Sequence, residues 1–460
     1  MTARPGGASA DGPTVVAVDC GASSIRVCRV DLGSRPPQLT IVHRYRHQPA
    51  RGGDGHLRWD WDRLVDEVEA GLAAALDRGP VASIGVDTWG VDYGLIDADG
   101  HLVAPPFSYR DHRTDGYLAT VEQLGAERLY ATTGIQLLPL NTLFQLAVHD
   151  RRELERARHV LMLPELLVHR LTGVVTAERT SAGTTGLVDL TTGDWSDELL
   201  GAIGVDRRLL PPIDRATTRV GVWRGVPVHL VGGHDTASAV VAMAAAPAAD
   251  AAFVSFGTWM LVGREQPLPE VGDGARKANF SNETGALGGI RLLKNLAGMW
   301  LLEGCRSAWH DPPVDRLLAD GAAIPPESAG TVDVIDVTDP RFLHPADMLG
   351  EVTAAAHLDR DAPPALVVRC LVESLADGTA QVLDQLAGAS ESGPVGEVHV
   401  FGGGVRSELY RQCLAARTGL PVIAGPVEAT ALGNALVQGL ALGIYETLAH
   451  ARAHLAEPLT

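Results

Sequence analysis

A histidine and an aspartate follow a strand-like segment near the middle of the sequence. Residues 228–231 predict a strand, and Gly233, His234, Asp235 and Thr236 come just after it. A carboxylate at the end of a strand can orient an alcohol and accept its proton late in a phosphoryl transfer. Asp235 also suits the N-cap of the helix predicted by the Ala- and Val-rich residues that follow, and on this motif alone the cap is favoured.

Glycine and hydroxyl side chains share two predicted turns. Asp19 ends a buried strand predicted over residues 15–19, and residues 20–24, Cys-Gly-Ala-Ser-Ser, form the turn after it; Gly257 and Thr258 follow a similar strand. Backbone N–H groups in such a turn can bind a phosphate, and the carboxylate of Asp19 can hold hydrated magnesium against that phosphate. An ordinary β-hairpin turn without a ligand is the alternative for the turn at residues 20–24.

Three consecutive glycines occupy residues 402–404, between a strand predicted at 398–401 and a helix predicted at 407–417. Glycine permits the close approach of backbone to a base or a ribose, although a strained turn without a ligand explains the triplet equally well. The two turns and the triplet could converge on one nucleotide from two domains.

Aromatic and polar side chains are mixed in two further segments, residues 87–93 (DTWGVDY) and 109–114 (YRDHRT). A flat apolar face beside several hydrogen-bonding groups suits a polyhydroxylated ligand, and an edge hairpin with a solvated charge cluster is the alternative. Asn295 could point into the same cleft, whereas Met299 and Trp300 are most simply core residues.

The basic residues exclude two familiar nucleotide sites. Lys277 and Lys294 are the only lysines, and the sequence has no Gly-Lys-Ser/Thr and no His-Arg-Asp segment. A Walker-type phosphate loop and a protein-kinase catalytic loop are therefore both excluded. A nucleotide must bind here through another geometry.

Charge and hydropathy exclude other classes of partner. The formal net charge is -18 without a basic run, so we expect neither a nucleic-acid nor a membrane partner. The sequence has no apolar stretch near the ~20 residues that span a bilayer and no signal-peptide pattern, which predicts a cytoplasmic protein. The five cysteines are scattered without CxxC spacing, which argues against a disulfide framework and a zinc site.

The order of the predicted elements identifies the fold class. The first part of the chain predicts a disordered head and then three strands, a helix and a strand, at residues 1–13, 15–19, 25–32, 39–47, 61–76 and 81–86. Three consecutive strands before alternating helix and strand is the order of a ribonuclease-H-like unit, whereas a Rossmann unit begins strand-helix-strand. The same order restarts near residue 251, with helices predicted at 296–308, 366–386 and 429–442 and a loop-rich insertion at 311–365. We therefore predict an α/β protein of two ribonuclease-H-like domains, residues 14–246 and 247–460, with the cleft between them.

The ordered set of motifs resembles the FGGY family of carbohydrate kinases over about residues 14–445. The segments that carry this resemblance are DCGASSIR, SIGVDTWGVDYG, SYRDHRT, GGHDTASAV, SFGTW, LLKNLAGMWLLEG, FGGG and GPVEATALGN. Within the family, DTWGVD, HDTASA and LKN resemble the branch that phosphorylates L-rhamnulose. The resemblance implies two actin-like ATPase domains that close on ATP-Mg²⁺ and a ketose. The first domain would carry the sugar site and the base, and the second the nucleotide site.

The resemblance also implies roles for individual residues. Asp235 matches the family's catalytic base, and Asp19 resembles the carboxylate that organises magnesium in actin-like ATPases. The residues that match sugar contacts are Gly90, His234, Asp235, Thr236 and Asn295. The residues that match nucleotide contacts are Ala22, Ser23, Ser24, Ile25, Arg26, Thr258, Glu303 and Gly403.

Two departures from the family pattern leave alternatives open. Glu303 stands where relatives can carry a glutamine that touches ATP, and its negative charge could weaken ATP binding. Residues 405–407, Val-Arg-Ser, replace a segment that more usually carries an amide. The alternatives are a kinase for another ketose such as L-fuculose or L-xylulose, a non-catalytic actin-like nucleotide-binding regulator, and a catalytically weakened paralogue.

Overall fold

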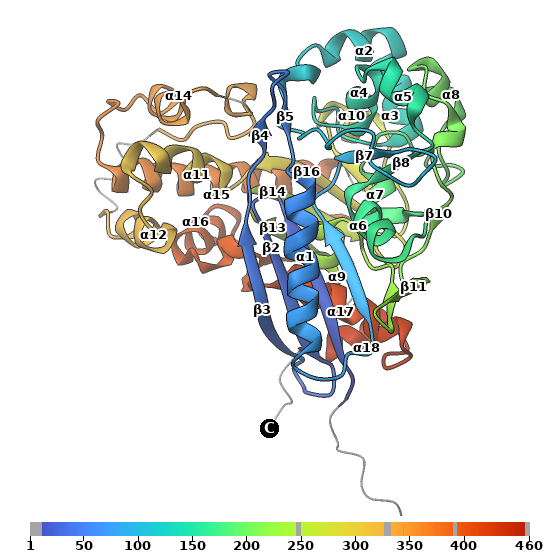
Figure 1. Cartoon of the computed structure of the whole chain (residues 1–460). Helices are drawn as coiled ribbons and strands as arrows, with labels where there is room; N and C mark the ends of the chain where they lie inside the picture. The colour runs from blue at the N-terminus through green and yellow to red at the C-terminus, as the bar shows by residue number, and fades with distance from the viewer. Residues whose placement is uncertain (1–11, 245–249, 326–332, 344, 390–392, 456–460) are drawn as a thin grey trace, which may run out of the picture.

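The apolar segment at the start of the chain forms the central strand of a mixed sheet (Figure 1). The computed structural model describes residues 12–244, 250–325, 333–343, 345–389 and 393–455. The six strands of the first sheet are, in spatial order, β11 (Arg219–Trp223), β12 (Val226–His229), β6 (Ile84–Thr88), β1 (Thr14–Gly21), β2 (Ser24–Asp31) and β3 (Gln38–Arg46). β1 runs antiparallel to β2 and parallel to β6, and β12 is also parallel to β6. The carboxyl ends of β1, β6 and β12 therefore meet at one edge of the sheet.

A second sheet repeats this arrangement. Its strands are β15 (Ser281–Thr284), β16 (Ile290–Ala297), β14 (Trp259–Gln266), β13 (Ala251–Phe256), β17 (Glu397–Phe401) and β18 (Val422–Ala424). The hairpin-linked strands are antiparallel, and β17 and β18 continue the sheet in parallel from β13. The repeated order confirms the predicted two-domain α/β fold.

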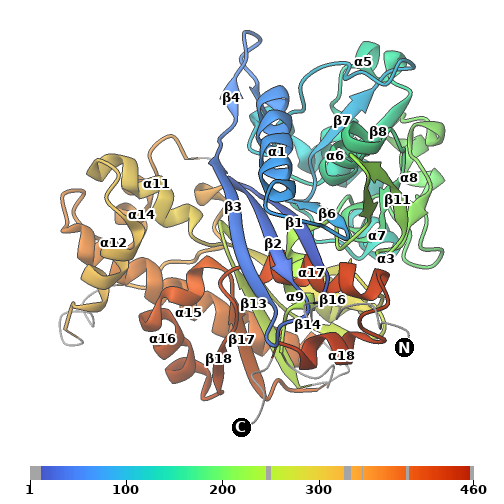
Figure 2. The same ribbon diagram turned by 60° about the horizontal axis from the view of Figure 1, so that its bottom comes forward.

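Two helices lie between the sheets, α9 (Asp235–Val241) and α17 (Ala429–Ala441) (Figure 2). Alternate residues of β1 divide between the two faces of its sheet: Val15 and Ala17 pack against α9 and α17, whereas Val16 and Val18 face α1 (Trp61–Leu76) and α6 (Leu163–Thr172). The other side of α9 packs on residues of β13. The helix pair thus fixes one sheet against the other.

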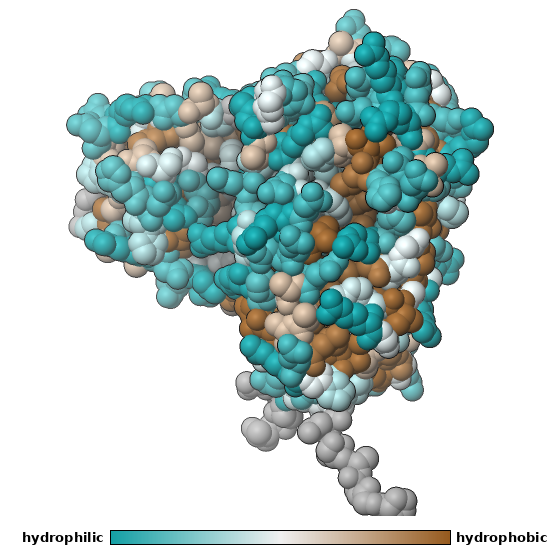
Figure 3. All heavy atoms as spheres, in the orientation of Figure 1, coloured by the Kyte–Doolittle hydropathy of each residue, from teal (hydrophilic) through white to brown (hydrophobic). Residues whose placement is uncertain are grey.

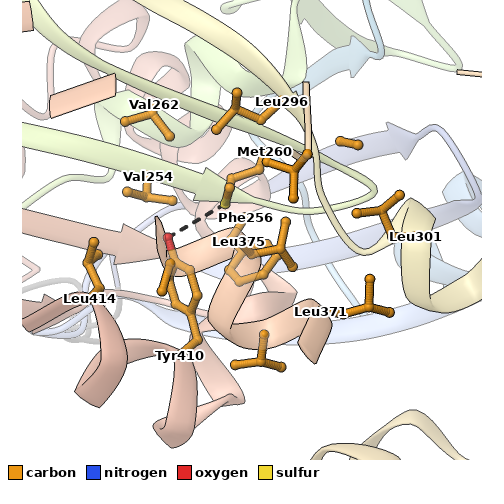
Figure 4. Close-up of a cluster of buried hydrophobic side chains, with 14 of the residues drawn as sticks. Val254, Phe256, Met260, Val262, Leu296, Leu301, Leu371, Leu375, Tyr410 and Leu414 are labelled. Carbon is orange, nitrogen blue, oxygen red and sulfur yellow. Dashed lines mark hydrogen bonds between the residues drawn. The ribbon is translucent and has the colours of Figure 1, made fainter. Parts of the chain in front are cut away.

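The outer face of the second sheet is covered by α15 (Pro364–Ala389) and α16 (Glu408–Thr418). Figure 4 shows the core between them, where Phe256 packs against Tyr410 and the Tyr410 hydroxyl reaches the sulfur of Met260 at 3.6 Å. This layer supports β13 and β14, the two strands that the turn of Gly257 and Thr258 joins.

The remaining helices and strands lie in the connections between the strands of the two sheets or, for α18, after α17. Between β6 and β11 lie β7 (Tyr93–Ile96), α2 (Tyr117–Leu124), α3 (Ala126–Thr133), α4 (Thr142–Ala147), α5 (Arg151–Arg156), β8 (His159–Met162), β9 (Ala177–Glu178), α7 (Arg179–Gly183), α8 (Asp197–Ala202) and β10 (Ile213–Asp214). Elsewhere there are β4 (Ala50–Arg51), β5 (Leu57–Arg58), α10 (Asp273–Lys277), α11 (Trp300–Arg306), α12 (Val314–Ala322), α14 (Met348–Ala355) and α18 (Leu448–Ala453).

Two sequence-based predictions were wrong, both between residues 296 and 365. The helix predicted at 296–308 begins only at Trp300, because β16 continues to Ala297 along β14. Residues 311–365 were predicted to be loop-rich, yet α12 and α14 lie there and bury Leu317, Met348 and Val352 in the core of the second sheet. The head at 1–11 and the boundary segment at 245–249 lie outside the described residues.

Hydrophilic side chains dominate the face shown in Figure 3 where α12 and α14 lie, and apolar side chains gather toward β11 and α18. Across the described ranges, no helix combines the length and the apolar character that crossing a bilayer requires.

The contact between α9 and α17 can be tested at Gly433. A methyl group added at Gly433 would overlap the carbonyl oxygen of Ser238 in α9, whereas one added at Gly388, an exposed residue of α15, would meet nothing within 4 Å. We expect Gly433→Ala to lower the free energy of unfolding by ~1–3 kcal/mol through overpacking. Gly388→Ala should raise it by ~0.5–1 kcal/mol. Chemical denaturation measures both, and equal effects would contradict the tight helix contact.

Candidate active site

The ends of β1, β6 and β13 and the start of α9 face one cavity between the two sheets. Its lining includes Asp19, Ala22, Ser23, Ser24, Arg26, Gly90, His234, Asp235, Thr236, Thr258, Asn295 and Gly403. Segments separated by up to about 380 residues in the sequence therefore meet in one place, as predicted.

The first turn presents a buried carboxylate held by an arginine. Asp19 and Arg26 are register partners on β1 and β2, and the Arg26 guanidinium donates from Nη1 to Asp19 Oδ2 at 3.0 Å. Arg26 Nε also lies 3.2 Å from Glu428 Oε2. Burial raises the pKa of Asp19 to about 6, with Arg26 opposing this and Asp235 and Glu428 adding to it. The positive charge of Arg26 is balanced within the protein, so that the turn offers a phosphate its backbone N–H groups and hydroxyls.

A second buried carboxylate lies beneath the first. Asp87 is the register partner of Asp19 on β6 and accepts a hydrogen bond from Asn434 Nδ2 of α17 at 2.6 Å. Burial, together with the charge of Asp19, raises the pKa of Asp87 well above its usual range. A helix from the C-terminal half of the chain thus holds a strand end of the N-terminal half.

Asp235 is the first residue of α9 and does not cap it. His234 occupies the N-cap position without a side-chain cap hydrogen bond, and Asp235 Oδ1 accepts from Thr236 N at 2.6 Å and from Thr236 Oγ1 at 3.2 Å. The N-cap alternative is therefore wrong. Burial raises the pKa of Asp235, although His234, Thr236 and Arg291 oppose this. A carboxylate that accepts protons more readily than a free aspartate lines the cavity.

Two buried glutamates hold the backbone that carries His234 and Asp235. Glu178 Oε2 accepts from Gly233 N at 2.9 Å, and Thr180 Oγ1 accepts from His234 N at 3.1 Å. Glu165 Oε1 accepts from Glu178 N at 2.9 Å. Burial raises the pKa of Glu165 to about 8, and the neighbouring Glu178 adds to this. No sequence motif indicated these two residues.

The turn at residues 89–92 is strained and braced. Val91 adopts a φ of 69°, which a β-branched residue rarely does. Asp92 holds the turn by accepting from Trp59 Nε1 at 2.7 Å and Trp89 Nε1 at 2.9 Å. A methyl group at Gly90 would lie 3.4 Å from the His234 ring, so glycine keeps this wall close to the histidine.

Asn295 lies on β16, directly before the segment for which a helix was predicted. Gln136 Oε1 accepts from both Asn295 N at 2.9 Å and Asn295 Nδ2 at 3.0 Å, and both residues line the cavity. Gln136 comes from a segment that carries no recognisable motif, so sequence reasoning missed it.

The nucleotide-side turns are shaped by backbone. Met299 N donates to Gly257 O and Trp300 N to Thr258 O, each at 3.0 Å, so the second turn is anchored to the start of α11. Gly402 has a φ of 85°, and a side chain at Gly403 would meet nothing within 4 Å. The triplet therefore leaves open space beside exposed backbone, as a ligand that rests on the chain requires.

Two aromatic contacts join the walls of the cavity. Trp259 Nε1 donates to the Tyr109 hydroxyl at 3.1 Å. The Arg110 guanidinium lies over the Trp300 ring, 4.9 Å from its centroid, and donates to Ala22 O at 3.3 Å. Residues of the YRDHRT segment thus connect the turn at residues 20–24 with the second half of the chain.

Comparison with known proteins gives the family. Residues 14–242 match the FGGY family of carbohydrate kinases, N-terminal domain, and residues 252–442 match its C-terminal domain. The chain belongs to the FGGY family of carbohydrate kinases.

Individual relatives support this assignment. Rhamnulokinases from Klebsiella pneumoniae (strain 342) and Pectobacterium carotovorum subsp. carotovorum (strain PC1) are each 40% identical, over 93% and 95% of this chain and 89% of each relative. A xylulose kinase structure from Lactobacillus acidophilus matches with a TM-score of 0.78 at 16% identity, over 95% of this chain and 91% of that one. Plasmodium falciparum glycerol kinase with ADP gives 0.74 at 14%, over 98% and 93%. These structures share the two-domain fold.

Two residues that the FGGY pattern implies as nucleotide contacts, Ile25 and Glu303, are not among the residues that line the cavity. The Ile25 side chain is fully buried in the core of the first sheet, so that only its backbone can serve a nucleotide. Glu303 lies on α11 outside the residues that line the cavity and pairs with Arg306. Arg306 balances the charge that could weaken ATP binding, and contact of Glu303 with ATP stays a prediction.

The FGGY cavity fits a magnesium ion that arrives with phosphates. In the described part of the chain, no three His, Cys, Asp or Glu side chains converge to hold a metal ion by themselves. Mg²⁺ usually takes one or two protein carboxylates and completes its shell with water and substrate phosphates. Asp19, buried beside the first phosphate turn, is such a carboxylate.

The protonated state of Glu165 can be tested through stability. Its pKa of about 8 exceeds the ordinary 4.5, so the folded protein keeps a proton that the unfolded chain releases between these values. Stability contributed by this group is lost as pH rises through that window, by up to ~1.4 kcal/mol per pH unit. In Glu165→Gln we expect the melting temperature to fall less between about pH 5 and pH 8 than in the wild type. The exposed Glu127→Gln is the control, and identical slopes for all three proteins would refute the assignment.

Proposed function

We propose that this protein transfers the γ-phosphoryl group of ATP to the 1-hydroxyl of L-rhamnulose, giving L-rhamnulose 1-phosphate and ADP in L-rhamnose catabolism. The observation that carries the proposal is the position of Asp235, a partly exposed carboxylate that lines the same cavity as the turns at residues 20–24 and 257–258. The 40% identity to rhamnulokinases over nearly the whole chain supports L-rhamnulose as the sugar. A reaction that consumes ATP and a sugar of central catabolism suits the cytoplasm.

The residues divide the work between the two domains, which we place at 14–246 and 247–460. Thr236 holds Asp235 Oδ1, which leaves Oδ2 to orient the sugar hydroxyl and accept its proton. The residues proposed to bind the sugar with Asp235 are Gly90, His234, Thr236 and Asn295. Those proposed to bind ATP are Ala22, Ser23, Ser24, Ile25, Arg26, Thr258 and Gly403. Mg²⁺ held at Asp19 would offset the negative charge of the phosphates.

The walls of the cavity also protect ATP from water. The contacts of Tyr109 with Trp259 and of Arg110 with Trp300 join the two sheets beside the site. Excluding water favours transfer to the sugar over hydrolysis and strengthens each electrostatic contact inside.

The base is tested by Asp235→Asn. ADP release is followed with MgATP and L-rhamnulose, L-fuculose, L-xylulose, D-xylulose or glycerol. We expect a strong preference for L-rhamnulose and a loss of ~10²–10⁴ in kcat in the variant, because an amide cannot accept the proton. The exposed Asp206→Asn serves as the matched control. Activity in the Asp235→Asn variant would contradict the assignment of Asp235 as the base. A wild-type protein that phosphorylates none of these sugars would favour the alternative of a non-catalytic nucleotide-binding regulator.

The raised pKa of Asp235 predicts the pH dependence. The reaction needs the ionised carboxylate, so kcat/KM for the sugar should fall as pH decreases through a value above that of an ordinary aspartate. Saturating MgATP removes Asp19 from this profile, because a bound cation keeps it ionised. The measurement is kcat/KM for L-rhamnulose from about pH 4.5 to 8, with circular dichroism to confirm that the fold persists. A flat profile down to the lowest pH would contradict the assignment.

A further inference from the structure

A buried ion pair lies behind His234 on the second sheet. Glu283 on β15 and Arg291 on β16 are register partners, and Arg291 Nη2 donates to Glu283 Oε2 at 3.0 Å. Their side chains are only 5% and 1% exposed. Such a cross-strand pair lies on one side of the sheet, and Glu283 is the member of the pair that lines the cavity.

Both groups meet the same nitrogen of His234. Glu283 Oε2 lies 3.2 Å and Arg291 Nη2 lies 3.3 Å from His234 Nδ1. The other ring nitrogen, Nε2, lies 3.4 Å from Asp235 Oδ1. The ring is therefore placed between the ion pair of one domain and the carboxylate of the other.

The chemistry of the two contacts differs. An ionised carboxylate can only accept a hydrogen bond from a protonated Nδ1, whereas a guanidinium can only donate a hydrogen bond to an unprotonated Nδ1. The balance between Glu283 and Arg291 therefore decides which ring nitrogen carries the proton, and so whether Nε2 presents a donor or a lone pair to Asp235 and the sugar.

A buried ion pair is weak evidence for a role in stability. Replacing a buried ion pair by apolar residues of similar volume is often neutral or stabilising, because desolvation costs as much as the attraction returns. Arg291 lowers the pKa of Asp235, while Arg291 and His234 hold the pKa of Glu283 below its usual range in spite of burial. The electrostatic effect of the pair thus reaches the carboxylate on the other side of the histidine.

We propose that Glu283 and Arg291 are positioning residues of the phosphoryl transfer, which fix the orientation and the proton position of His234 and set the basicity of Asp235 from the opposite domain. This inference rests on the proposed function for its kinetic part. The inference means that catalysis needs both domains. The base and its histidine come from the first domain, and the ion pair that orients the histidine comes from the second sheet.

The test compares Glu283→Gln and Arg291→Gln with the wild type and with Glu373→Gln. Glu373 is a matched control, since it is also paired with arginines, Arg369 and Arg417, but lies outside the residues that line the cavity. For each protein, kcat, KM for ATP and the pH profile of kcat/KM for L-rhamnulose are measured.

We expect kcat to fall at least ~10-fold in both variants, with KM for ATP unchanged. The acid limb should move in opposite directions. In Glu283→Gln the unbalanced positive charge of Arg291 stabilises ionised Asp235, so the limb moves to lower pH; in Arg291→Gln that charge is lost and the limb moves to higher pH. Asp19 and Asp87, which also interact with Asp235, are unchanged in both variants. Damage to packing alone would not reverse the direction, so shifts of one sign, or wild-type kcat, would overturn the proposal.

A second measurement does not depend on activity. In ¹⁵N-histidine NMR spectra, with His234→Gln to assign the signal, Glu283→Gln should change the Nδ1 and Nε2 shifts of His234 and Glu373→Gln should not. An unchanged His234 signal refutes the positioning role even if the wild type phosphorylates no sugar, an outcome that would separately refute the proposed function. If a single variant fails to fold, Glu283→Gln/Arg291→Gln, which leaves no unpaired charge, replaces it. Wild-type kcat in that protein would also overturn the proposal.

Discussion

The close contact of α9 with α17 is the constraint on which the cavity depends. Gly433 lets the backbone of α17 approach Ser238 of α9 more closely than any side chain would permit. The two helices fill the space between the sheets, with β1 on one side and β13 on the other. The strand ends that carry Asp19 and Thr258 are therefore held facing each other, and α9 begins at Asp235 between them. Since no single strand end makes a nucleotide site, catalysis depends on this helix contact although neither Gly433 nor Ser238 lines the cavity.

Negative charge is concentrated at this interface. Asp19, Asp87 and Glu283 are buried side chains around it and Asp235 is partly exposed, whereas the nearby cations Arg26 and Arg291 are already engaged by carboxylates. Burial raises the pKa of Asp19, Asp87 and Asp235, and neighbouring carboxylates add to this at Asp19 and Asp87. Such a site repels the phosphates of ATP unless a cation accompanies them. The charge distribution thus explains in physical terms why ATP would enter with Mg²⁺, and why a lysine-based phosphate loop is not needed.

The sequence predicted what depends on local pattern. Strands and helices with clear periodicity, such as α1, appeared where the pattern placed them, and the glycine-hydroxyl turns indicated the cavity because they end strands. It failed where tertiary pairing decided the outcome. Leu296 and Ala297 extend β16 because β14 offers hydrogen-bond partners, and the apolar residues of α12 and α14 are buried because α12 packs on α15 and α14 packs on α11. Glu283, Gln136 and Glu165 were missed because their contacts join segments whose spacing carries no signal.

The two sheets share one topology, but the cavity walls at the ends of β6 and β17 differ. β6 and β17 occupy the same position in their sheets, each parallel to the central strand, and each ends at a glycine-containing turn that lines the cavity. In the first sheet the turn at Gly90 is braced by Trp89 and Asp92, which gives a rigid wall with polar groups. In the second, Gly402 and Gly403 leave backbone uncovered. A rigid polar wall discriminates between sugars, since it can leave the wrong hydroxyl unpaired, whereas bare backbone accepts a flat base by close contact. On the proposed function, the same topology would supply sugar selectivity on one side of the phosphates and contact with the base on the other, and the ion pair of Glu283 and Arg291 would be where the second wall acts on the chemistry of the first.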